Sequence, residues 1–282
     1  MAAQINMTKF VSDSSADYLK IEGVNFISIP LSISTDRKTY TDDELLDPCE
    51  MLSDLEAYQG RSYTACPGTQ AWLKAYEGGD RIYVCALTSL ISGTYNSALL
   101  AAQLYTEKHP GVQIHVFDSL TTGPCLRLLV EKVIELDQSG LPFEEVIRQA
   151  ELYMKTTRLY FAFQSLHNFA QNGRVNKVLA AAISTFGIRI IGTASPEGNI
   201  DPITKSRGDK KTMDQLLSMI REAGCCGRKI KILHADNPSL AETYCRALQN
   251  IYPAAEIEVY QARGLCSYYA ERGGIIVGFE TV

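Results

Sequence analysis

Short apolar runs alternate with longer amphipathic segments through the first half of the chain. The apolar runs predict strands at 8–12, 25–33, 81–87 and 112–117. The amphipathic segments predict helices at 41–55, 70–76, 92–105 and 121–136. Strands that alternate with helices of this length are typical of βαβ units. We therefore expect an α/β N-terminal domain with a Rossmann-like parallel sheet.

The pattern changes after Leu141 and Pro142. Two strand-like runs, 188–193 and 200–205, flank the turn residues 195–199 and predict a hairpin. Further strands are expected at 158–163, 229–234, 257–261 and 275–280, and helices at 143–153, 177–185, 239–250 and 264–271. This arrangement predicts an α+β C-terminal domain. We expect two domains, residues 1–155 and 156–282, that meet at a cleft.

Composition excludes several classes of protein. The 282 residues carry a formal net charge of −5, which argues against nucleic acid as the main partner. No apolar run reaches the length of a membrane span, and the N-terminus lacks the pattern of a secretory signal, so we expect a cytoplasmic protein without a membrane span. The eight cysteines show no CxxC spacing and the four histidines no HExxH spacing, so free thiols and no metal site are expected.

Small polar residues follow three of the predicted strands, at 13–15, 89–94 and 118–119. Ligands of open parallel sheets bind outside the carboxyl ends of the strands. The hydroxyls around Gly93 either cap the following helix or bind an anion at its N-terminus. Asp13 and Asp118 have two interpretations: they cap helices, or they serve a phosphotransferase or hydrolase. The chain contains no phosphate-binding loop and no GxSxG sequence, which favours a protein that is not an enzyme.

Two further segments are candidates for a site. Pro67 restricts Cys66 to an extended conformation, so Thr64 lies in an extended segment that either faces a cleft or forms an ordinary turn. Gly173 is typical of the residue that ends a helix. Arg174 then either pairs with an anion or bonds the carbonyls at that helix end.

Six short motifs occur in order along the chain. They are FVSDSSAD at 10–17, TACP at 64–67, LISGTYNSA at 90–98, VFDS at 116–119, QNGRV at 171–175 and KSRG at 205–208. None of them is specific alone. Together they resemble the DegV family of bacterial fatty-acid-binding proteins over nearly the whole chain.

The resemblance implies an EDD-type fold that holds a long-chain fatty acid, such as palmitate, between its two domains. The carboxylate would bond the hydroxyls of Thr64 and Ser92, and the acyl chain would fill an apolar tunnel. Gly93, Thr94, Ser14 and Arg174 complete the expected ligand-binding set. Some family members present the bound acid to a fatty acid kinase, which would be the protein partner. No cofactor is expected.

Two positions depart from the family pattern. The dipeptide Ala65-Cys66 stands where Ser-Gln is usual, and Ala270 stands where the family's C-terminal His-x-Gly-Pro-Gly motif has its histidine. These departures bear on delivery to a kinase more than on binding. A binder of another acidic lipid remains an alternative.

Overall fold

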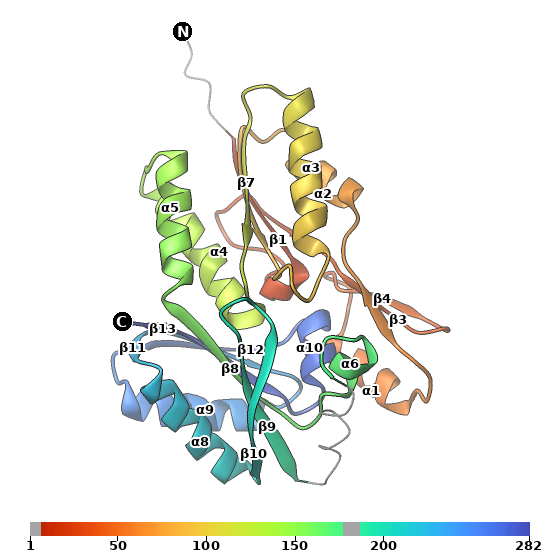
Figure 1. Ribbon diagram of the computed structural model, residues 1–282, viewed down its shortest axis with the longest axis vertical. Coiled ribbons are helices and arrows are strands. Elements are labelled where there is room, and N and C mark those ends of the chain that lie inside the picture. Colours follow the sequence, from red (N-terminus) through yellow and green to blue (C-terminus); the bar gives the residue numbers. More distant parts are fainter. Residues whose placement is uncertain (1–6, 177–186) are drawn as a thin grey trace.

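The structure is a computed structural model that describes residues 7–176 and 187–282. The helix expected at 177–185 lies outside the described residues. The chain folds around two large sheets and one small sheet (Figure 1).

A four-stranded parallel sheet with the order β2-β1-β6-β7 organises the N-terminal part. Its strands are β1 (Thr8–Asp13), β2 (Phe26–Ile29), β6 (Arg81–Ala86) and β7 (Gln113–Asp118). Every pairing in it is parallel, which confirms the predicted α/β pattern. The carboxyl ends of β1, β6 and β7 therefore share one edge, as the sequence predicts.

Two layers of helices cover this sheet (Figure 1). They are α2 (Thr69–Tyr76) and α3 (Thr94–Lys108) on one face, and α4 (Gly123–Gln138) and α5 (Phe143–Met154) on the other. Successive strand residues point to opposite faces. Val84 accordingly packs with α2 and α3, while Tyr83 packs with α4 and α5.

The predicted strand 25–33 is wrong as a single element. Proline has no N–H for a sheet hydrogen bond, and Pro30 separates β2 from β3 (Ser32–Ser34). β3 leaves the parallel sheet and pairs antiparallel with β4 (Thr39–Thr41) and β5 (Tyr63–Ala65). Thr64 belongs to this small sheet, where it pairs with Ile33 of β3.

The predicted helix 41–55 begins later than expected. The helix is α1 (Pro48–Ala57), and the Asp47 carboxylate caps it by accepting hydrogen bonds from the N–H groups of Cys49 and Glu50. Pro48 suits the first helical position because the N–H that it lacks would have no intrahelical partner. The acidic residue Asp42, which resembled part of a helix start, instead bonds the backbone at Gly264.

A six-stranded sheet with the order β10-β9-β8-β13-β11-β12 organises the C-terminal part. Its strands are β8 (Thr157–Phe163), β9 (Ile188–Ala194), β10 (Ile200–Arg207), β11 (Cys225–His234), β12 (Glu256–Gln261) and β13 (Ile275–Thr281). The antiparallel pair β9–β10 confirms the predicted hairpin, and β11–β12 is the parallel pair.

Helices α8 (Asp209–Glu222) and α9 (Pro238–Ile251) pack on one face of this second sheet. The other face packs against α6 (His167–Gln171) and α10 (Gly264–Ala270) and turns toward the N-terminal part (Figure 1). The sequence pattern did not predict α8. It predicted only the end of α6, at Gly173, and a helix start at 13–17, where the structure has the 3-10 turn η1 (Ser14–Ala16).

Helix α4 joins the two parts. Its Glu131 carboxylate pairs with the Lys231 ammonium of β11 at 2.7 Å, and its Arg127 pairs with Glu258 of β12. We propose the domain boundary at 155/156, because the strands of the parallel sheet end at Asp118 and those of the second sheet begin at Thr157.

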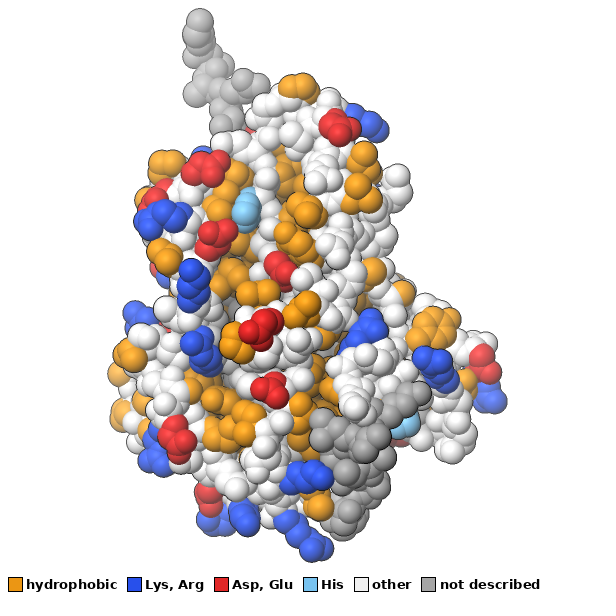
Figure 2. Space-filling model, in the orientation of Figure 1, with side chains coloured by type: hydrophobic (Ala, Val, Ile, Leu, Met, Phe, Trp, Pro, Cys, Tyr) orange, Lys and Arg blue, Asp and Glu red, His pale blue; other side chains and the backbone are white. Residues whose placement is uncertain are grey.

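On the face in Figure 2, acidic and basic side chains are interspersed, without a large patch of one sign.

Candidate functional site

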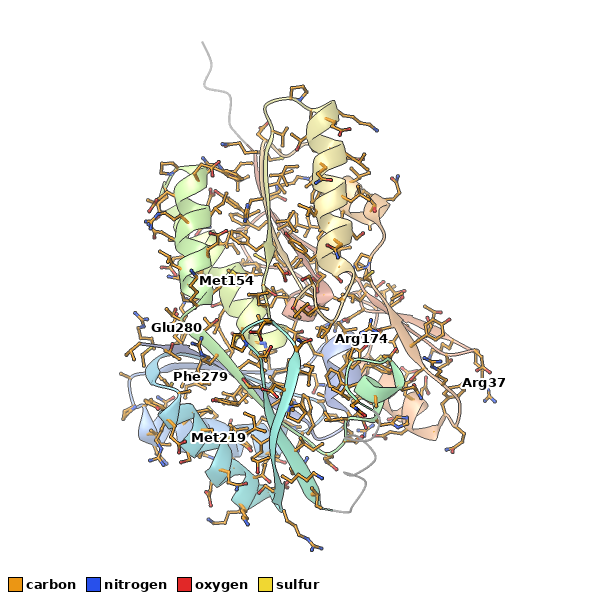
Figure 3. All side chains as sticks on the ribbon, viewed as in Figure 1. Arg37, Met154, Arg174, Met219, Phe279 and Glu280 are labelled. Carbon is orange, nitrogen blue, oxygen red and sulfur yellow. The ribbon has the colours of Figure 1, made fainter. Side chains whose placement is uncertain are left out.

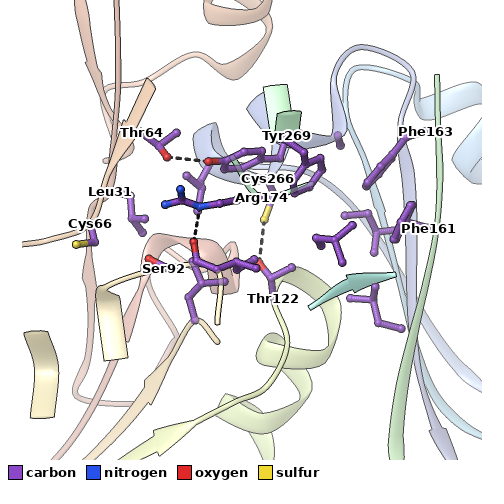
Figure 4. A pocket seen from close by; sticks show the side chains of 18 of the residues that line it. Leu31, Thr64, Cys66, Ser92, Thr122, Phe161, Phe163, Arg174, Cys266 and Tyr269 are labelled. Carbon is purple, nitrogen blue, oxygen red and sulfur yellow. Dashed lines mark hydrogen bonds between the residues drawn. The ribbon is translucent and has the colours of Figure 1, made fainter. Parts of the chain in front are cut away.

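A cavity of about 240 Å³ lies where the two parts meet. One buried water needs only about 10–15 Å³, so the cavity has room for an organic ligand. Its wall includes residues from β5, from the loop before α3, from β8 and from α10. Most of these residues are apolar, and the polar groups gather on one side (Figure 4).

Aromatic rings form a ladder along the cavity. The rings of Phe161 and Phe163 stack with centroids 4.3 Å apart, and Phe163 lies 6.1 Å from Phe169. Phe169 in turn stacks on Tyr269 at 4.6 Å. The ladder leads from an apolar interior to a tyrosine hydroxyl, which suits an amphipathic ligand with one polar end.

Thr64 lies at the polar end. Its hydroxyl forms a hydrogen bond of 2.8 Å with the hydroxyl of Tyr269, and its backbone N–H donates to the Asn172 side chain. Figure 4 shows Thr64 and Ser92 on one side of the cavity and Phe161 and Phe163 on the other. A helix and a strand separate these two residues in the sequence, and the fold places both on the wall of one cavity.

The loop before α3 supplies Ser92 and Gly93. The hydroxyls of Ser92 and Thr94 lie 2.7 Å apart, and the Ser92 hydroxyl also accepts the Thr94 N–H at 3.3 Å. Thr94 is fully buried, so in this structure its hydroxyl supports the Ser92 hydroxyl from the side of the protein interior. A side chain on Gly93 would meet the Cys66 sulfur at 3.1 Å. Glycine therefore allows the loop and the β5 segment to approach closely.

Arg174, which lies near α6 in Figure 3, lines the cavity on the side of Thr64 and Ser92 (Figure 4). Its Nε donates to the Ile91 carbonyl at 2.7 Å, and a terminal nitrogen donates to the Asn172 carbonyl at 2.5 Å. Asn172 is the C-cap of α6, and Gly173 has a φ of 74°, which agrees with the predicted helix end. Arg174 thus ties this helix end to the loop before α3 and still lines the cavity.

Ser14 contacts a residue of the cavity wall from outside the cavity. It is 1% exposed, and its hydroxyl accepts the backbone N–H of Leu31 at 3.1 Å. Leu31 itself lines the cavity. In this structure Ser14 therefore supports the wall from outside.

The two strand-end aspartates bond to the backbone. Asp13 accepts hydrogen bonds from the N–H groups of Leu87 and Ser15, and Asp118 accepts one from Ser89 at 3.0 Å. Burial raises the pKa of the Asp13 carboxyl above its usual range. These contacts fix the loops at the sheet edge.

Tyr269 was not predicted as a site residue, although its hydroxyl lies at the polar end. No local motif distinguishes it from Tyr268, whose hydroxyl bonds to Ser62 and Asn172 instead. Burial raises the pKa of the Tyr269 hydroxyl, while its bond to Thr64 and the charge of Arg174 oppose that rise. At neutral pH Tyr269 therefore keeps its proton.

The described residues contain no group of three or more His, Cys, Asp or Glu side chains that would hold a metal ion. All eight cysteines are free thiols. No helix within the described ranges is long and apolar enough to cross a bilayer.

The model of the DegV family, described as an uncharacterised protein family, matches residues 7–281. The chain belongs to the DegV family. A DegV domain-containing protein of Streptococcus gordonii is 36% identical over 276 residues, which cover 96% of this chain and 98% of that protein. These matches confirm the resemblance that the ordered motifs carry.

Solved structures of the DegV family share the whole fold. A protein from Eubacterium eligens loaded with heptadecanoic acid is 45% identical, with a TM-score of 0.95 over 98% of this chain and 100% of its own. The Streptococcus pneumoniae Fatty Acid Kinase (Fak) B3 protein, loaded with linoleic acid, is 34% identical, with the same TM-score and coverage. A Ruminococcus gnavus protein refined with vaccenic acid is 28% identical, with a TM-score of 0.89 over 96% of this chain and 99% of its own.

Proposed function

We propose that this DegV protein binds one long-chain fatty acid. Its carboxylate lies at Thr64 and Ser92, and its acyl chain runs along the aromatic ladder. The observation that carries the proposal is that the hydroxyl-bearing residues Thr64 and Ser92 line the polar side of a mostly apolar cavity. The three similar structures that hold long-chain fatty acids support it.

The energetics agree with this ligand. Burial of about 15 methylenes at roughly 0.8 kcal/mol each contributes on the order of 12 kcal/mol. Association costs roughly 4–15 kcal/mol, so the apolar wall must supply most of the affinity. The hydroxyls then orient the carboxylate, since each hydrogen bond to a charged group adds about 1.5–3 kcal/mol.

In this proposal the protein carries its ligand and performs no chemistry on it. The engagement of Asp13 and Asp118 with backbone N–H groups supports this view over a phosphotransferase or hydrolase. The similar S. pneumoniae protein bears the name of a fatty acid kinase, which supports presentation of the bound acid to such a kinase as the role of this chain.

The test is identification of the bound lipid. The purified protein is extracted with organic solvent, and the extract is analysed by mass spectrometry beside an extract of a Thr64→Ala, Ser92→Ala double variant. We expect a stoichiometric long-chain fatty acid from the wild type and a depleted amount from the variant. Another acidic lipid in the wild-type extract would replace the fatty acid in the proposal, and an extract without any lipid acid would overturn it.

A further inference from the structure

A second cavity, of about 610 Å³, adjoins the first one, and Leu159 belongs to the walls of both. Its wall is formed by the loop 119–121, the last turn of α5, the start of β8 and residues 193–196 of the β9–β10 hairpin. Met154, a residue of this wall, lies in Figure 3 where α5 ends and β8 begins. Ligand pockets of proteins measure about 300–1,000 Å³, so the second cavity has the size of a small-molecule site.

Leu120 holds an unfavourable backbone conformation in this wall. Its φ is 53°, in the left-handed region that a bulky residue rarely adopts. Its side chain is 38% exposed, so packing in a core does not explain the leucine. The hairpin turn packs against this backbone, because a Cβ on Gly198 would lie only 2.9 Å from the Leu120 Cα. Residues strained in this way cluster at ligand sites and active sites.

Two exposed cations in the same wall have bonding capacity left. The Lys155 ammonium has no ion-pair or hydrogen-bond partner among the described residues. The Arg158 guanidinium donates from one terminal nitrogen to the carbonyls of Lys155 and Thr157, at 2.8 and 2.7 Å, which fixes its position. Its other two nitrogens bond no residue that the structure describes. Glu151 is the one acidic residue among the described wall residues, so the wall carries a net positive charge.

We infer that the second cavity binds a small amphipathic anion. Its carboxylate or phosphate head lies at Lys155 and Arg158, since ammonium and guanidinium groups form strong charge-assisted bonds with both kinds of head. Its apolar body lies on Leu120 and Met154. This inference does not rest on the proposed fatty-acid binding, because the second cavity shares only Leu159 with the first.

The experiment titrates palmitate-saturated protein with octanoate, octyl phosphate and octyltrimethylammonium in a calorimeter. We expect at least one of the two anions to bind at one site per chain, and the tighter of them identifies the head. The cation should bind about tenfold more weakly or less tightly still, because it loses the charge-assisted bonds. The absence of binding by either anion overturns the inference, as does equal binding of the cation. Release of palmitate during the titration would place the probe in the first cavity and also overturn it.

Lys155→Glu tests the position of the head. It should weaken binding of the anion about tenfold or more, because it replaces a charged donor with a like charge. The matched control is Lys108→Glu, at another exposed lysine near the end of a helix, α3, and outside both cavities. The control should keep the wild-type affinity, and palmitate affinity should not change in either variant. Equal losses of anion affinity in both variants would overturn the assignment to this cavity.

Leu120→Asn tests the position of the apolar body. Asparagine tolerates the left-handed backbone, so the denaturant midpoint should remain at or above that of the wild type. The anion should bind severalfold more weakly, because its apolar body loses the leucine side chain. Unchanged anion affinity in this variant overturns the inference. Wild-type protein that fails to bind palmitate would instead refute the proposed function, and the comparison of the variants then tests the second cavity without palmitate.

Discussion

The Asp42 carboxylate accepts the backbone N–H of Gly264 at 2.7 Å, across 222 positions of the chain. Its other oxygen accepts the N–H of Leu265 at 2.9 Å. Asp42, the residue after β4 of the small sheet, therefore caps a helix of the C-terminal part. A carboxylate at this place also interacts favourably with the helix dipole. The cap joins the two sides of the cavity, because Leu265 and Tyr269 of that helix line it.

We predict that Asp42→Ala lowers both stability and fatty-acid affinity. The free energy of unfolding should fall by about 1–3 kcal/mol, because two bonds to a charged acceptor are lost. Urea unfolding measures the first effect and palmitate titration the second. The matched control is Asp47→Ala, which removes an exposed cap from α1 with two similar bonds. It should cost about 1 kcal/mol and leave palmitate affinity unchanged. Equal ligand affinity in both variants would show that the α10 cap does not position the site.

Asp17 gives a prediction about pH. Burial raises the pKa of its carboxyl to about 7 in the folded protein, from 3.8. The folded state then holds a proton that the unfolded state has already lost between these values, so stability falls as pH rises from about 4 to 7. Since one pKa unit is worth 1.36 kcal/mol, the whole effect is on the order of 4 kcal/mol.

Asp17→Asn removes this titration and keeps the bond from the Arg263 N–H, because the side-chain oxygen remains. Asparagine also tolerates the left-handed backbone at this position, where φ is 57°. The variant should match the wild type near pH 4 and exceed its denaturant midpoint at pH 8. Buried carboxyls other than Asp42, whose charge interacts with that of Asp17, contribute to both proteins equally, so the difference reports mainly on Asp17. A constant difference between the two proteins from pH 4 to 8 would contradict the raised pKa.

Much of the fold follows from local pattern. Each strand of the parallel sheet is a short apolar run, and the hairpin at 195–199 follows from its turn residues. The predicted elements are wrong where a contact with a residue far away in the sequence determines the local structure. The stretch at Asp42 has the acidic residues of a helix start, but its actual partner is the backbone of Gly264. No sequence pattern near Asp42 indicates that partner.

Some residues of the candidate site could likewise be predicted from the sequence, and others could not. The motifs identified Thr64 and Ser92 because the resemblance carries them, and the fold brings both to one cavity. Tyr269 was missed because Tyr268 and Tyr269 look alike in the sequence. Their successive positions on helix α10 give the two side chains different directions, so that the Tyr268 hydroxyl bonds Ser62 and the Tyr269 hydroxyl bonds Thr64.

We predict that the protein alone hydrolyses neither ATP nor acyl phosphate. The carboxylates of Asp13 and Asp118 are engaged with backbone N–H groups of the loops at the sheet edge. Phosphate release is measured with Mg²⁺ for the wild type, Asp13→Asn and Asp118→Asn, and all three should remain at the background rate. Metal-dependent hydrolysis that disappears in either variant would favour the enzyme interpretation instead.

The last prediction concerns the coupling of Thr64 and Ser92. If both hydroxyls bond one carboxylate, each alanine substitution should weaken palmitate binding by about 1–3 kcal/mol, because a charged acceptor loses a donor. The effects of the two substitutions should not add, since they share one ligand group. Calorimetric titration of the wild type, both single variants and the double variant measures this coupling.

Hexadecanol and unfolding experiments provide the controls for this cycle. Hexadecanol lacks the charge, so its affinity should respond far less to either substitution. Without ligand, Ser92→Ala should lose up to about 1 kcal/mol of stability, because the Ser92 hydroxyl accepts the Thr94 N–H at the start of α3. Thr64→Ala should change stability little, because the Tyr269 hydroxyl that it leaves faces the cavity. Palmitate affinity that stays at the wild-type level in the double variant would remove both residues from the head-group site. Additive losses would place them on two independent parts of the ligand.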